Sequence, residues 1–389
     1  MKRSKQNPKE GIRILIIHQF LWAHYKAKIY TELQKVVDKH PNAELLVLQT
    51  ALNEFTRANI GNIDWSIHQY NVKLLFEDFY ENTTILQRVK KCIYWINQFK
   101  PNVVNVPGYY EPAMNIVLFY CRLKGIKVII SSDSSEADNP NISWRESIKS
   151  FIVRKAHGFF CYGTKSADYM LKLGATPEQI LVKNNSVDNQ RIAETHQVAL
   201  KTREEDKKAL GLKKYNFVYV GRLIKIKNLD NLLKAYNKLN TDDWGVILLG
   251  DGQELDELQA YVKEHQLSGV KFIEGKPWYD VPKYLALGDV FILPSYSEPW
   301  GLVLNEAMAC EMPILVSEKC GSAIDLVDEG KNGFNFDPYD IDSMSKAMNH
   351  FIENPELIKP FGQRSKEIIR YYSPENVAQE MFDGVCKIL

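Results

Sequence analysis

Short apolar runs alternate with amphipathic stretches along most of the chain. The runs are rich in Val, Ile and Leu, which is typical of buried parallel strands, and the stretches between them carry apolar residues at helical spacing. In the first half the predicted strands are 12–18, 43–50, 71–76, 102–106, 127–131, 159–163 and 179–184. The predicted helices are 23–37, 85–99, 112–124, 143–156 and one that begins at Thr164. This alternation predicts a parallel sheet covered by helices on both faces.

The alternation restarts after a polar, highly charged segment, residues 186–213, which we interpret as a link between two domains. The second set of predicted strands is 215–221, 245–252, 270–275, 289–293 and 313–317. Helices are predicted from Asn228, Glu254, Asp280 and Trp300, and over the tail 341–389 with breaks at Pro355, Pro360 and Pro374. We therefore expect two open α/β domains that face each other across a cleft at the carboxyl ends of their strands.

Length and composition agree with two domains and exclude some functions. A chain of 389 residues exceeds what one core usually organises, and 45% hydrophobic with 25% charged residues is ordinary for a soluble globular protein. A formal net charge of +1 argues against a protein that coats nucleic acid. The six cysteines are scattered without metal-ligand spacing, and no apolar stretch is long enough to span a bilayer. These features predict a cytoplasmic protein with reduced cysteines and no bound metal.

Four segments lie outside the regular alternation or carry clustered charge. The long loops 50–70 and 132–142 are candidates for acceptor recognition or for lids. The basic segments 2–9 and 144–155 offer Lys and Arg side chains to an anionic membrane, which predicts a possible peripheral contact. For the second of these the alternative is that its apolar side, formed by Trp144, Ile148, Phe151 and Ile152, simply covers the sheet.

Residues 289–310 carry the most informative chemistry of the chain. They predict a buried strand, a tight turn and then a helix that begins at Trp300. A helix beginning beside the end of a strand favours an anion, because free backbone N–H groups and the helix dipole point there. Glu298 in the turn and Glu306 in the helix add carboxylates that suit hydroxyl groups. A sugar nucleotide has both phosphates and hydroxyls, so this segment is a candidate sugar-nucleotide site. The alternative is an ordinary solvated helix start with two surface carboxylates.

A second strand–loop–helix unit, residues 218–233, supplies cations. Gly221 permits a tight turn, and Arg222 and Lys227 flank the loop that leads into the helix. An arginine and a lysine so placed can both reach one diphosphate, the first as a fork and the second as a point charge. The G-D-G at 250–252 predicts another tight turn near the same edge. Taken alone, the loop is better explained as a surface loop that carries three basic residues, Lys225 included.

The order of these motifs resembles a known enzyme family. G-R-L-x-x-x-K (221–227), G-D-G (250–252) and P-S-x-x-E-P-W-G-L-x-x-x-E-A-M-A (294–309) are similar to the retaining glycosyltransferases of family 4, which have the two-domain GT-B fold. The likeness is close through the C-terminal half. In the N-terminal half, residues 174–188 resemble the stretch that leads into the family's interdomain link.

The resemblance implies a domain division. It assigns residues 1–190 to an acceptor-side domain and residues 191–372 to a domain that binds the nucleotide sugar. The last helix, 373–389, would cross back onto the first domain. Both domains would be Rossmann-like and doubly wound, which agrees with the alternation of strands and helices.

The resemblance also implies roles for single residues. Arg222 and Lys227 would hold the donor diphosphate after the turn at Gly221, and Glu298 would bind hydroxyls of the donor sugar. The remaining donor-site residues are Glu306 at the ribose, the amides of Gly301 and Leu302 at the distal phosphate, and Lys276 and Pro277 near the base.

A reaction follows from these roles. The donor would be a nucleoside-diphosphate sugar, for which we expect a UDP-sugar, and a hexose would move with retention of configuration to a glycan or lipid-linked acceptor. The expected setting is bacterial surface polysaccharide or glycoconjugate synthesis, and no cofactor is required. The sequence does not identify the base, the sugar or the acceptor.

The chain departs from the family pattern in two places. Many members have a Gly-Gly loop after the first strand, whereas this chain has H-Q-F-L-W-A-H-Y-K-A-K at 18–28. Many members also have a His after the strand at 127–131, where this chain places Asp133 or its neighbour Ser132. We keep Asp133 as a candidate catalytic residue. The alternative is a turn-forming Asp in a Ser-rich loop.

Two further observations bear on mechanism. The D-x-D at Asp340–Asp342 stands at a predicted helix start, where capping explains it, so Arg222 and Lys227 are expected to do the work of a metal ion. A sugar-nucleotide 2-epimerase shares the scaffold but needs no acceptor, and a non-catalytic sugar-nucleotide-binding module is a third alternative.

Overall fold

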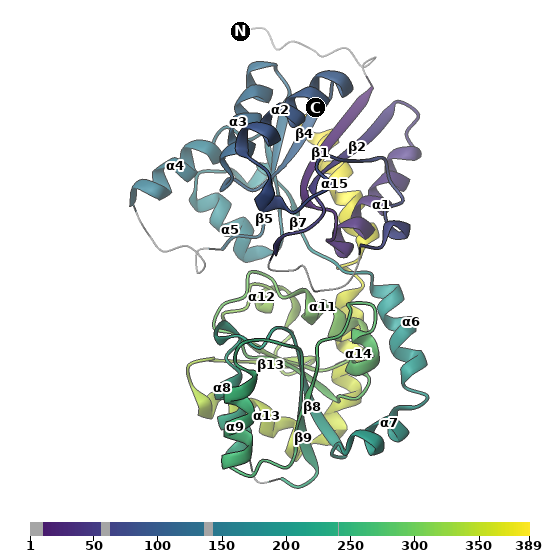
Figure 1. Cartoon of the computed structure of the whole chain (residues 1–389), viewed down its shortest axis with the longest axis vertical. Helices are drawn as coiled ribbons and strands as arrows, with labels where there is room; N and C mark the ends of the chain where they lie inside the picture. Colours follow the sequence, from purple (N-terminus) through teal and green to yellow (C-terminus); the bar gives the residue numbers. More distant parts are fainter. Residues whose placement is uncertain (1–10, 56–62, 136–142, 240) are drawn as a thin grey trace.

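The chain forms two α/β units that lie one above the other along the long axis of the molecule (Figure 1). The computed structural model describes residues 11–55, 63–135, 143–239 and 241–389. The basic segment 2–9 and parts of the predicted loops 50–70 and 132–142 lie outside these residues. None of the described helices is both long and apolar enough to cross a membrane.

The first domain is built on a parallel sheet of seven strands in the order β3-β2-β1-β4-β5-β6-β7. Its strands are β1 (Ile12–Phe20), β2 (Ala43–Ala51), β3 (Val72–Leu74), β4 (Val103–Pro107), β5 (Lys127–Ser132), β6 (Gly158–Cys161) and β7 (Ile180–Lys183). Its helices are α1 (His24–Asp38), α2 (Ile85–Phe99), α3 (Pro112–Leu123), α4 (Ser143–Val153) and α5 (Thr164–Lys172), with short 3₁₀ turns at Trp65–Ile67, Tyr80–Asn82 and Pro177–Gln179. Separate apolar cores fill the two faces of this sheet.

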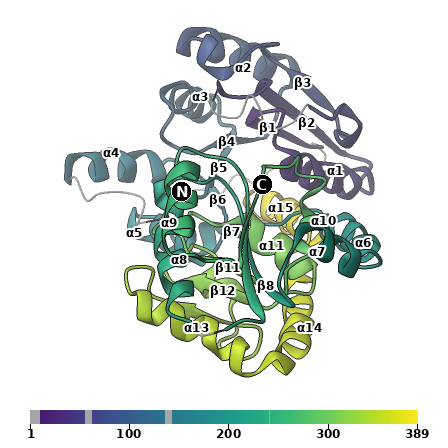
Figure 2. The same cartoon turned by 60° about the horizontal axis from the view of Figure 1, so that its bottom comes forward.

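The second domain is built on a parallel sheet of six strands in the order β10-β9-β8-β11-β12-β13. Strands β8, β11 and β12 of this sheet are labelled in Figure 2. The strands are β8 (Tyr215–Val220), β9 (Trp244–Leu249), β10 (Val270–Ile273), β11 (Val290–Leu293), β12 (Ile314–Ser317) and β13 (Gly333–Phe336). The helices are α6 (Asn189–Ala199), α7 (Arg203–Leu210), α8 (Leu229–Asn237), α9 (Leu255–Glu264), α10 (Val281–Leu285), α11 (Leu302–Ala309), α12 (Ala323–Leu326), α13 (Ile341–Glu353) and α14 (Ile358–Ile369), with 3₁₀ turns at Lys225–Lys227 (η5) and Pro355–Leu357. The four residues of β11 are fully buried, as expected of a strand covered on both faces.

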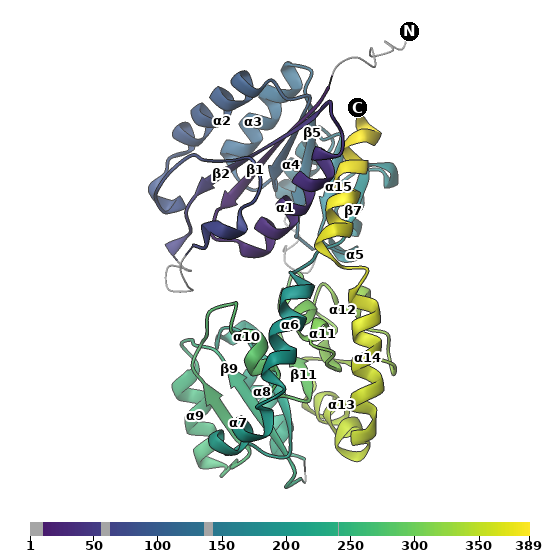
Figure 3. The same cartoon turned by 90° about the vertical axis from the view of Figure 1, so that its right-hand side faces the viewer.

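The last helix, α15 (Pro374–Ile388), returns to the first domain and packs against α1 and β7 (Figure 3). Ser373 caps its N-terminus by accepting a hydrogen bond from the Asn376 amide. The side chains that bury this helix in the same core as α1 are Val377, Ala378, Met381, Phe382 and Val385. The two parallel sheets and this returning helix confirm the predicted fold class.

The structure differs from the prediction in local features. The segment 186–213, interpreted as a link, stands between the two sheets and forms α6 and α7, and α6 packs on α10 and α11. Trp300 is not helical, because α11 begins two residues later, after Gly301. Pro360 does not break a helix, since it lies in the first turn of α14, where its missing N–H costs nothing.

The exposure of α4 contradicts the alternative that its apolar side covers the sheet. Trp144, Ile148 and Phe151 are 62%, 51% and 55% exposed, and only Ile152 of that group is buried. The helical spacing was therefore read correctly, but most of this apolar side faces outward. The D-x-D, by contrast, is confirmed as a cap, since the Asp340 carboxylate accepts a hydrogen bond from the Asp342 amide at 2.9 Å.

Candidate active site

Two glycine turns bring the ends of β8 and β9 together at the edge of the second sheet. The Gly221 amide donates to the Leu249 carbonyl at 3.0 Å, and the Leu223 amide donates to the Asp251 carbonyl at 2.8 Å. A Cβ on Gly250 would lie only 1.9 Å from the Gly221 carbonyl oxygen, so the two turns can approach this closely only without a side chain there. The G-R and G-D-G motifs are therefore neighbours in space.

The cations of the first motif have different surroundings. Arg222 is exposed, and in the described part of the chain its guanidinium makes no ion pair or hydrogen bond. Lys227, at the end of η5, bonds the Glu298 carboxylate, and the two side chains are 15% and 17% exposed. The following residue, Asn228, donates to the Pro294 carbonyl at 3.0 Å and to the Pro338 carbonyl at 2.7 Å. These bonds fasten the cationic loop to the turn after β11 and to the segment after β13.

The turn between β11 and α11 is held by buried hydrogen bonds. The Trp300 indole donates to the Asn305 amide oxygen at 2.8 Å, and the Cys320 thiol donates to the Trp300 carbonyl at 3.1 Å. Gly301 has a φ of 83°, a left-handed conformation that favours glycine, and it precedes the first residue of α11. Within the described ranges, the amides of Gly301 and Leu302 have no protein acceptor. Their N–H groups are available to an anion.

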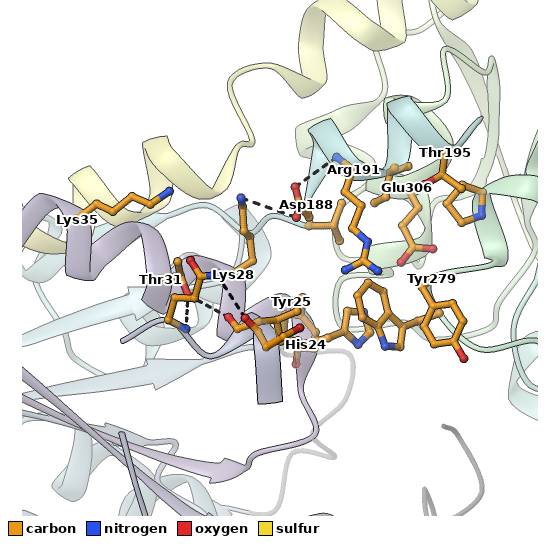
Figure 4. A pocket seen from close by; sticks show the side chains of 17 residues that line it. His24, Tyr25, Lys28, Thr31, Lys35, Asp188, Arg191, Thr195, Tyr279 and Glu306 are labelled. Atoms are coloured by element: carbon orange, nitrogen blue, oxygen red, sulfur yellow. Dashed lines mark hydrogen bonds and ion pairs between the residues drawn. The ribbon is translucent and has the colours of Figure 1, made fainter. Parts of the chain in front are cut away.

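Glu306 lies farther along α11 and lines a cavity of about 280 Å³ between the domains (Figure 4). Burial raises the pKa of this carboxyl from 4.5 to about 7. Neither Glu298 nor the two cations line the same cavity. The structure therefore brings Lys227 and Glu298 together and sets Glu306 apart, in a neighbouring space.

The sequence did not assign a role to the other residues of this cavity, although three of them lie in the segment 18–28 that departs from the family pattern. The first domain contributes His24, Tyr25, Lys28 and Thr31, and the second contributes Arg191, Trp278 and Tyr279. The His24 and Trp278 rings are stacked across the domain boundary with their centroids 4.1 Å apart, and the Arg191 guanidinium lies 4.5 Å from the centre of the Trp278 ring. The available signal for Trp278 was that it stands beside a second aromatic residue, Tyr279, shortly after the predicted strand 270–275.

Lys276 and Pro277, predicted near the base, do not themselves line the cavity. The Lys276 ammonium lies 3.8 Å from the Glu274 carboxylate, and the Pro277 carbonyl accepts from the Asp280 amide at 2.9 Å. The loop after β10 reaches the cavity with Trp278, the next residue. If Lys276 or Pro277 contacts a base, the base must therefore lie outside this cavity, beside the same loop.

Asp133 follows β5 at the carboxyl edge of the first sheet and is exposed. It lies close enough to Lys26 of α1 to raise the pKa of that ammonium, although burial lowers it more. Its neighbour Ser132 is buried, and the Ser132 hydroxyl accepts a hydrogen bond from the Ser134 amide at 3.3 Å. Of the two residues considered at this position, Asp133 is therefore the exposed one.

The two domains meet beside this site. The Thr164 amide, at the start of α5, donates to the Asp325 carboxylate at 2.9 Å, and the Lys165 ammonium donates to the Glu318 carbonyl at 2.8 Å. Asn305 of α11 donates to the Asn185 carbonyl at 3.2 Å. Across residues 11–55, 63–135, 143–239 and 241–389, no group of three or more His, Cys, Asp and Glu side chains is placed to hold a metal ion.

The raised pKa of Glu306 gives a pH prediction. Only the ionised carboxylate accepts from two hydroxyls, so its contribution to nucleotide binding should grow as the pH rises from 6 to 8, through about 7. Titrating the unaltered protein and Glu306→Gln with UDP at both pH values measures this difference, because the ionisation of the phosphate is common to both. Equal pH dependence of the two proteins would contradict a ribose contact by the carboxylate.

Comparison with known proteins identifies part of the chain. Residues 201–368 match the family described as Glycosyl transferases group 1. An uncharacterized glycosyltransferase of Methanocaldococcus jannaschii is 28% identical over 162 residues, which cover 41% of this chain and 45% of that protein. The N-acetylgalactosamine-N,N'-diacetylbacillosaminyl-diphospho-undecaprenol 4-alpha-N-acetylgalactosaminyltransferase of Campylobacter jejuni is 27% identical over 216 residues, 55% of each chain. The matches span about half the length of these curated relatives.

A solved structure extends the likeness to the whole chain. The Anabaena protein HepE in complex with UDP has a TM-score of 0.74 with 18% identity, covering 96% of this chain and 98% of that one. At this identity the likeness concerns the fold alone. The segment 201–368 is therefore similar to group 1 glycosyl transferases, and the chain as a whole has the two-domain GT-B fold of glycosyltransferase structures.

Proposed function

We propose that this protein is a retaining glycosyltransferase that moves a hexose from a nucleoside-diphosphate sugar to a glycan or lipid-linked acceptor. Residues 191–372 would bind the donor, and residues 1–190 with 373–389 would bind the acceptor. The expected donor is a UDP-sugar, a choice supported by the UDP bound to the structurally similar HepE. The expected setting is bacterial surface polysaccharide or glycoconjugate synthesis on the cytoplasmic side, which fits the six free cysteines.

One observation carries the proposal: cations, free amides and a carboxylate converge at the beginning of α11. Lys227 bonds Glu298 there, the amides of Gly301 and Leu302 have no acceptor among the described residues, and Arg222 extends from the neighbouring strand end. Phosphates suit the cations and amides, while sugar hydroxyls suit the carboxylate. A nucleoside-diphosphate sugar contains both kinds of group.

The contact between Lys227 and Glu298 indicates how the donor is received. Both side chains are mostly buried, so neither can be left without a partner at low cost. A diphosphate that takes Lys227 releases Glu298, whose carboxylate is then free to accept from sugar hydroxyls. Donor binding would thus exchange one ion pair for two contacts with substrate.

The proposed reaction needs cationic stabilisation more than covalent chemistry. When the bond between the sugar C1 and the phosphate oxygen breaks, its electron pair stays on the diphosphate, and Arg222, Lys227 and the α11 amides stabilise the added charge. The acceptor oxygen attacks C1 from the same face and gives its proton to a phosphate oxygen. Asp133, exposed at the edge of the first sheet, would orient the acceptor or the sugar from the other side of the cleft.

Acceptor dependence separates this function from its alternatives. A sugar-nucleotide 2-epimerase turns over its donor without an acceptor, and a non-catalytic binding module does not turn it over at all. The test is a panel of UDP-, GDP- and ADP-sugars in which nucleoside diphosphate release is measured with and without a glycan and lipid acceptor mixture. Acceptor-dependent release from one donor is the expected result, and epimerisation or no turnover of any donor would contradict the proposal.

We expect the activity to survive EDTA, because Arg222 and Lys227 are placed to neutralise the diphosphate that a metal ion neutralises in other transferases. The measurement is the initial rate after chelation and desalting, compared with the rate after added magnesium or manganese. Complete loss on chelation with recovery by either metal would assign the diphosphate work to a metal ion.

A peripheral membrane contact is part of the proposal and is supported by the surface of α4. Trp144, Ile148 and Phe151 are exposed, the Arg145 guanidinium lies 5.3 Å from the Trp144 ring centre, and the Lys155 ammonium lies 5.0 Å from that of Phe151. Exposed aromatic groups beside cations suit an anionic bilayer surface.

This contact predicts salt-sensitive flotation with vesicles containing phosphatidylglycerol. Replacing both Trp144 and Phe151 by Ala should abolish flotation, whereas Tyr371→Ala, which removes an aromatic ring that is 73% exposed elsewhere, should not. Equal flotation of the two variants, or no flotation of the unaltered protein, would contradict a membrane role for α4.

A further inference from the structure

Lys26 is a buried cation near the carboxyl edge of the first sheet. It belongs to the first turn of α1 and is 5% exposed. Its ammonium lies 3.4 Å from the centre of the Tyr162 ring, which follows β6, and 5.3 Å from that of Tyr25. In the ranges that the structure describes, no carboxylate pairs with this ammonium and no hydrogen bond to it is present.

The groups around Lys26 leave its charge only partly compensated. His18 of β1 is held neutral, since burial and the Lys26 charge lower its pKa to about 4. Asp133 after β5 and Tyr25 act on Lys26 from a greater distance, and burial still lowers the pKa of Lys26 to about 8. A buried ammonium with an aromatic face but no anion close by is costly in a folded protein. Its position therefore suits a ligand that brings the anion.

The residue after Tyr162 packs against the second domain. Tyr162 is followed by Gly163, where a Cβ would lie 2.3 Å from Cζ3 of Trp300 in the second domain. Trp300 in turn leads directly into Gly301 and α11. Lys26, which lies over the Tyr162 ring, is therefore next to the part of the first domain that packs against Trp300 before α11.

We propose that Lys26 is a third cation of the donor site, which binds the distal phosphate of a nucleoside diphosphate from the first-domain side of the cleft. This inference rests on the proposed function and adds a residue of the other domain to Arg222 and Lys227. As the bond to the sugar breaks, the electron pair remains on the distal phosphate, and the Lys26 N–H groups donate to that phosphate. Because the second-domain cations approach from one side only, the diphosphate would be fully surrounded only when both domains contact it.

Calorimetric titration of Lys26→Met with a diphosphate and its monophosphate tests this role. The probe is whichever of UDP, GDP and ADP binds the unaltered protein most tightly. The variant should bind the diphosphate tenfold to a hundredfold more weakly and the monophosphate equally well, because only the diphosphate has the distal group. Lys26→Arg should retain most of the affinity, and Lys39→Met, at the exposed end of the same helix, should match the unaltered protein.

A pH profile separates contact from a structural role. Diphosphate affinity of the unaltered protein should fall above pH 8 as Lys26 loses its proton, whereas Lys26→Arg should show no such fall. Undiminished diphosphate affinity of Lys26→Met would overturn the inference while leaving the donor site of the second domain intact. If none of the three diphosphates binds the unaltered protein, the proposed function fails as well, so the two failures are distinct.

Discussion

Replacing Arg222 by Ala should lower turnover by on the order of 10²-fold or more without lowering the melting temperature. The residue is exposed, and its guanidinium makes no ion pair or hydrogen bond within the described part of the protein, so folding loses no such interaction when it is removed. In the reaction it would neutralise charge that grows on the leaving diphosphate, and removal of one such donor costs about 10²- to 10³-fold in other enzymes. Steady-state kinetics beside thermal unfolding measures both effects.

Lys227→Ala should lose a similar factor in turnover, but it should also destabilise the protein. Its removal leaves the mostly buried Glu298 carboxylate without its partner. The matched control is Lys225→Ala in the same loop, because Lys225 is 67% exposed and pairs with Asp230 at 3.2 Å. Its turnover should stay within about twofold of the original, as surface ion pairs contribute little. Near-normal turnover of both Arg222→Ala and Lys227→Ala would contradict the assignment of the diphosphate to this loop.

Glu298→Gln and Glu306→Gln should differ in what they impair. Glu306 is proposed to hold the ribose, which does not change during the reaction, so its loss should weaken binding of the bare nucleoside diphosphate by about 1.5–3 kcal/mol. Glu298 is proposed to hold the sugar, so Glu298→Gln should retain diphosphate affinity and lose turnover. Because Glu298 competes for Lys227 in the structure, its neutral variant should bind the diphosphate slightly more tightly.

The two variants are each other's controls. Both variants keep the shape of the side chain and one acceptor. Glu298 lies in the turn before α11, and Glu306 lies in α11 itself. Calorimetry with the diphosphate reports binding, and kinetics with the intact donor reports turnover. Small and equal effects of the two substitutions would mean that neither carboxylate contacts the donor.

The fold could be predicted from the sequence where local signals agreed. Helix 85–99 coincides with α2 because Thr84 and Gln87 form a capping box and Lys100 adopts a left-handed conformation after the helix. Strand β13 was not predicted, since its four residues, G-F-N-F, lack an apolar run. The helices α6 and α7 were not predicted, because their composition is polar. Helices that are mostly exposed lack the apolar stripe by which a sequence pattern indicates a helix.

Only the second-domain side of the candidate site could be predicted, because the sequence motifs lie in that domain. The sequence named Lys227 and Glu298, and the structure joins them across 71 positions of chain. The first-domain side of the site could not be predicted. His24 stacks on Trp278 and Lys26 lies over Tyr162, and no local sequence pattern indicates these contacts. Arg191 was missed for a related reason, since it lies on a helix within the segment interpreted as a link.

The central claim is that a nucleoside diphosphate binds where η5, Glu298 and the beginning of α11 converge. The most direct measurement is calorimetric titration of UDP, GDP and ADP into the unaltered protein and into a variant with both Arg222 and Lys227 replaced by Ala. We predict that one of the three binds the unaltered protein with a stoichiometry of one, and that the double variant binds it at least tenfold more weakly. Equal affinity of the two proteins, or no binding of any diphosphate, would contradict the claim.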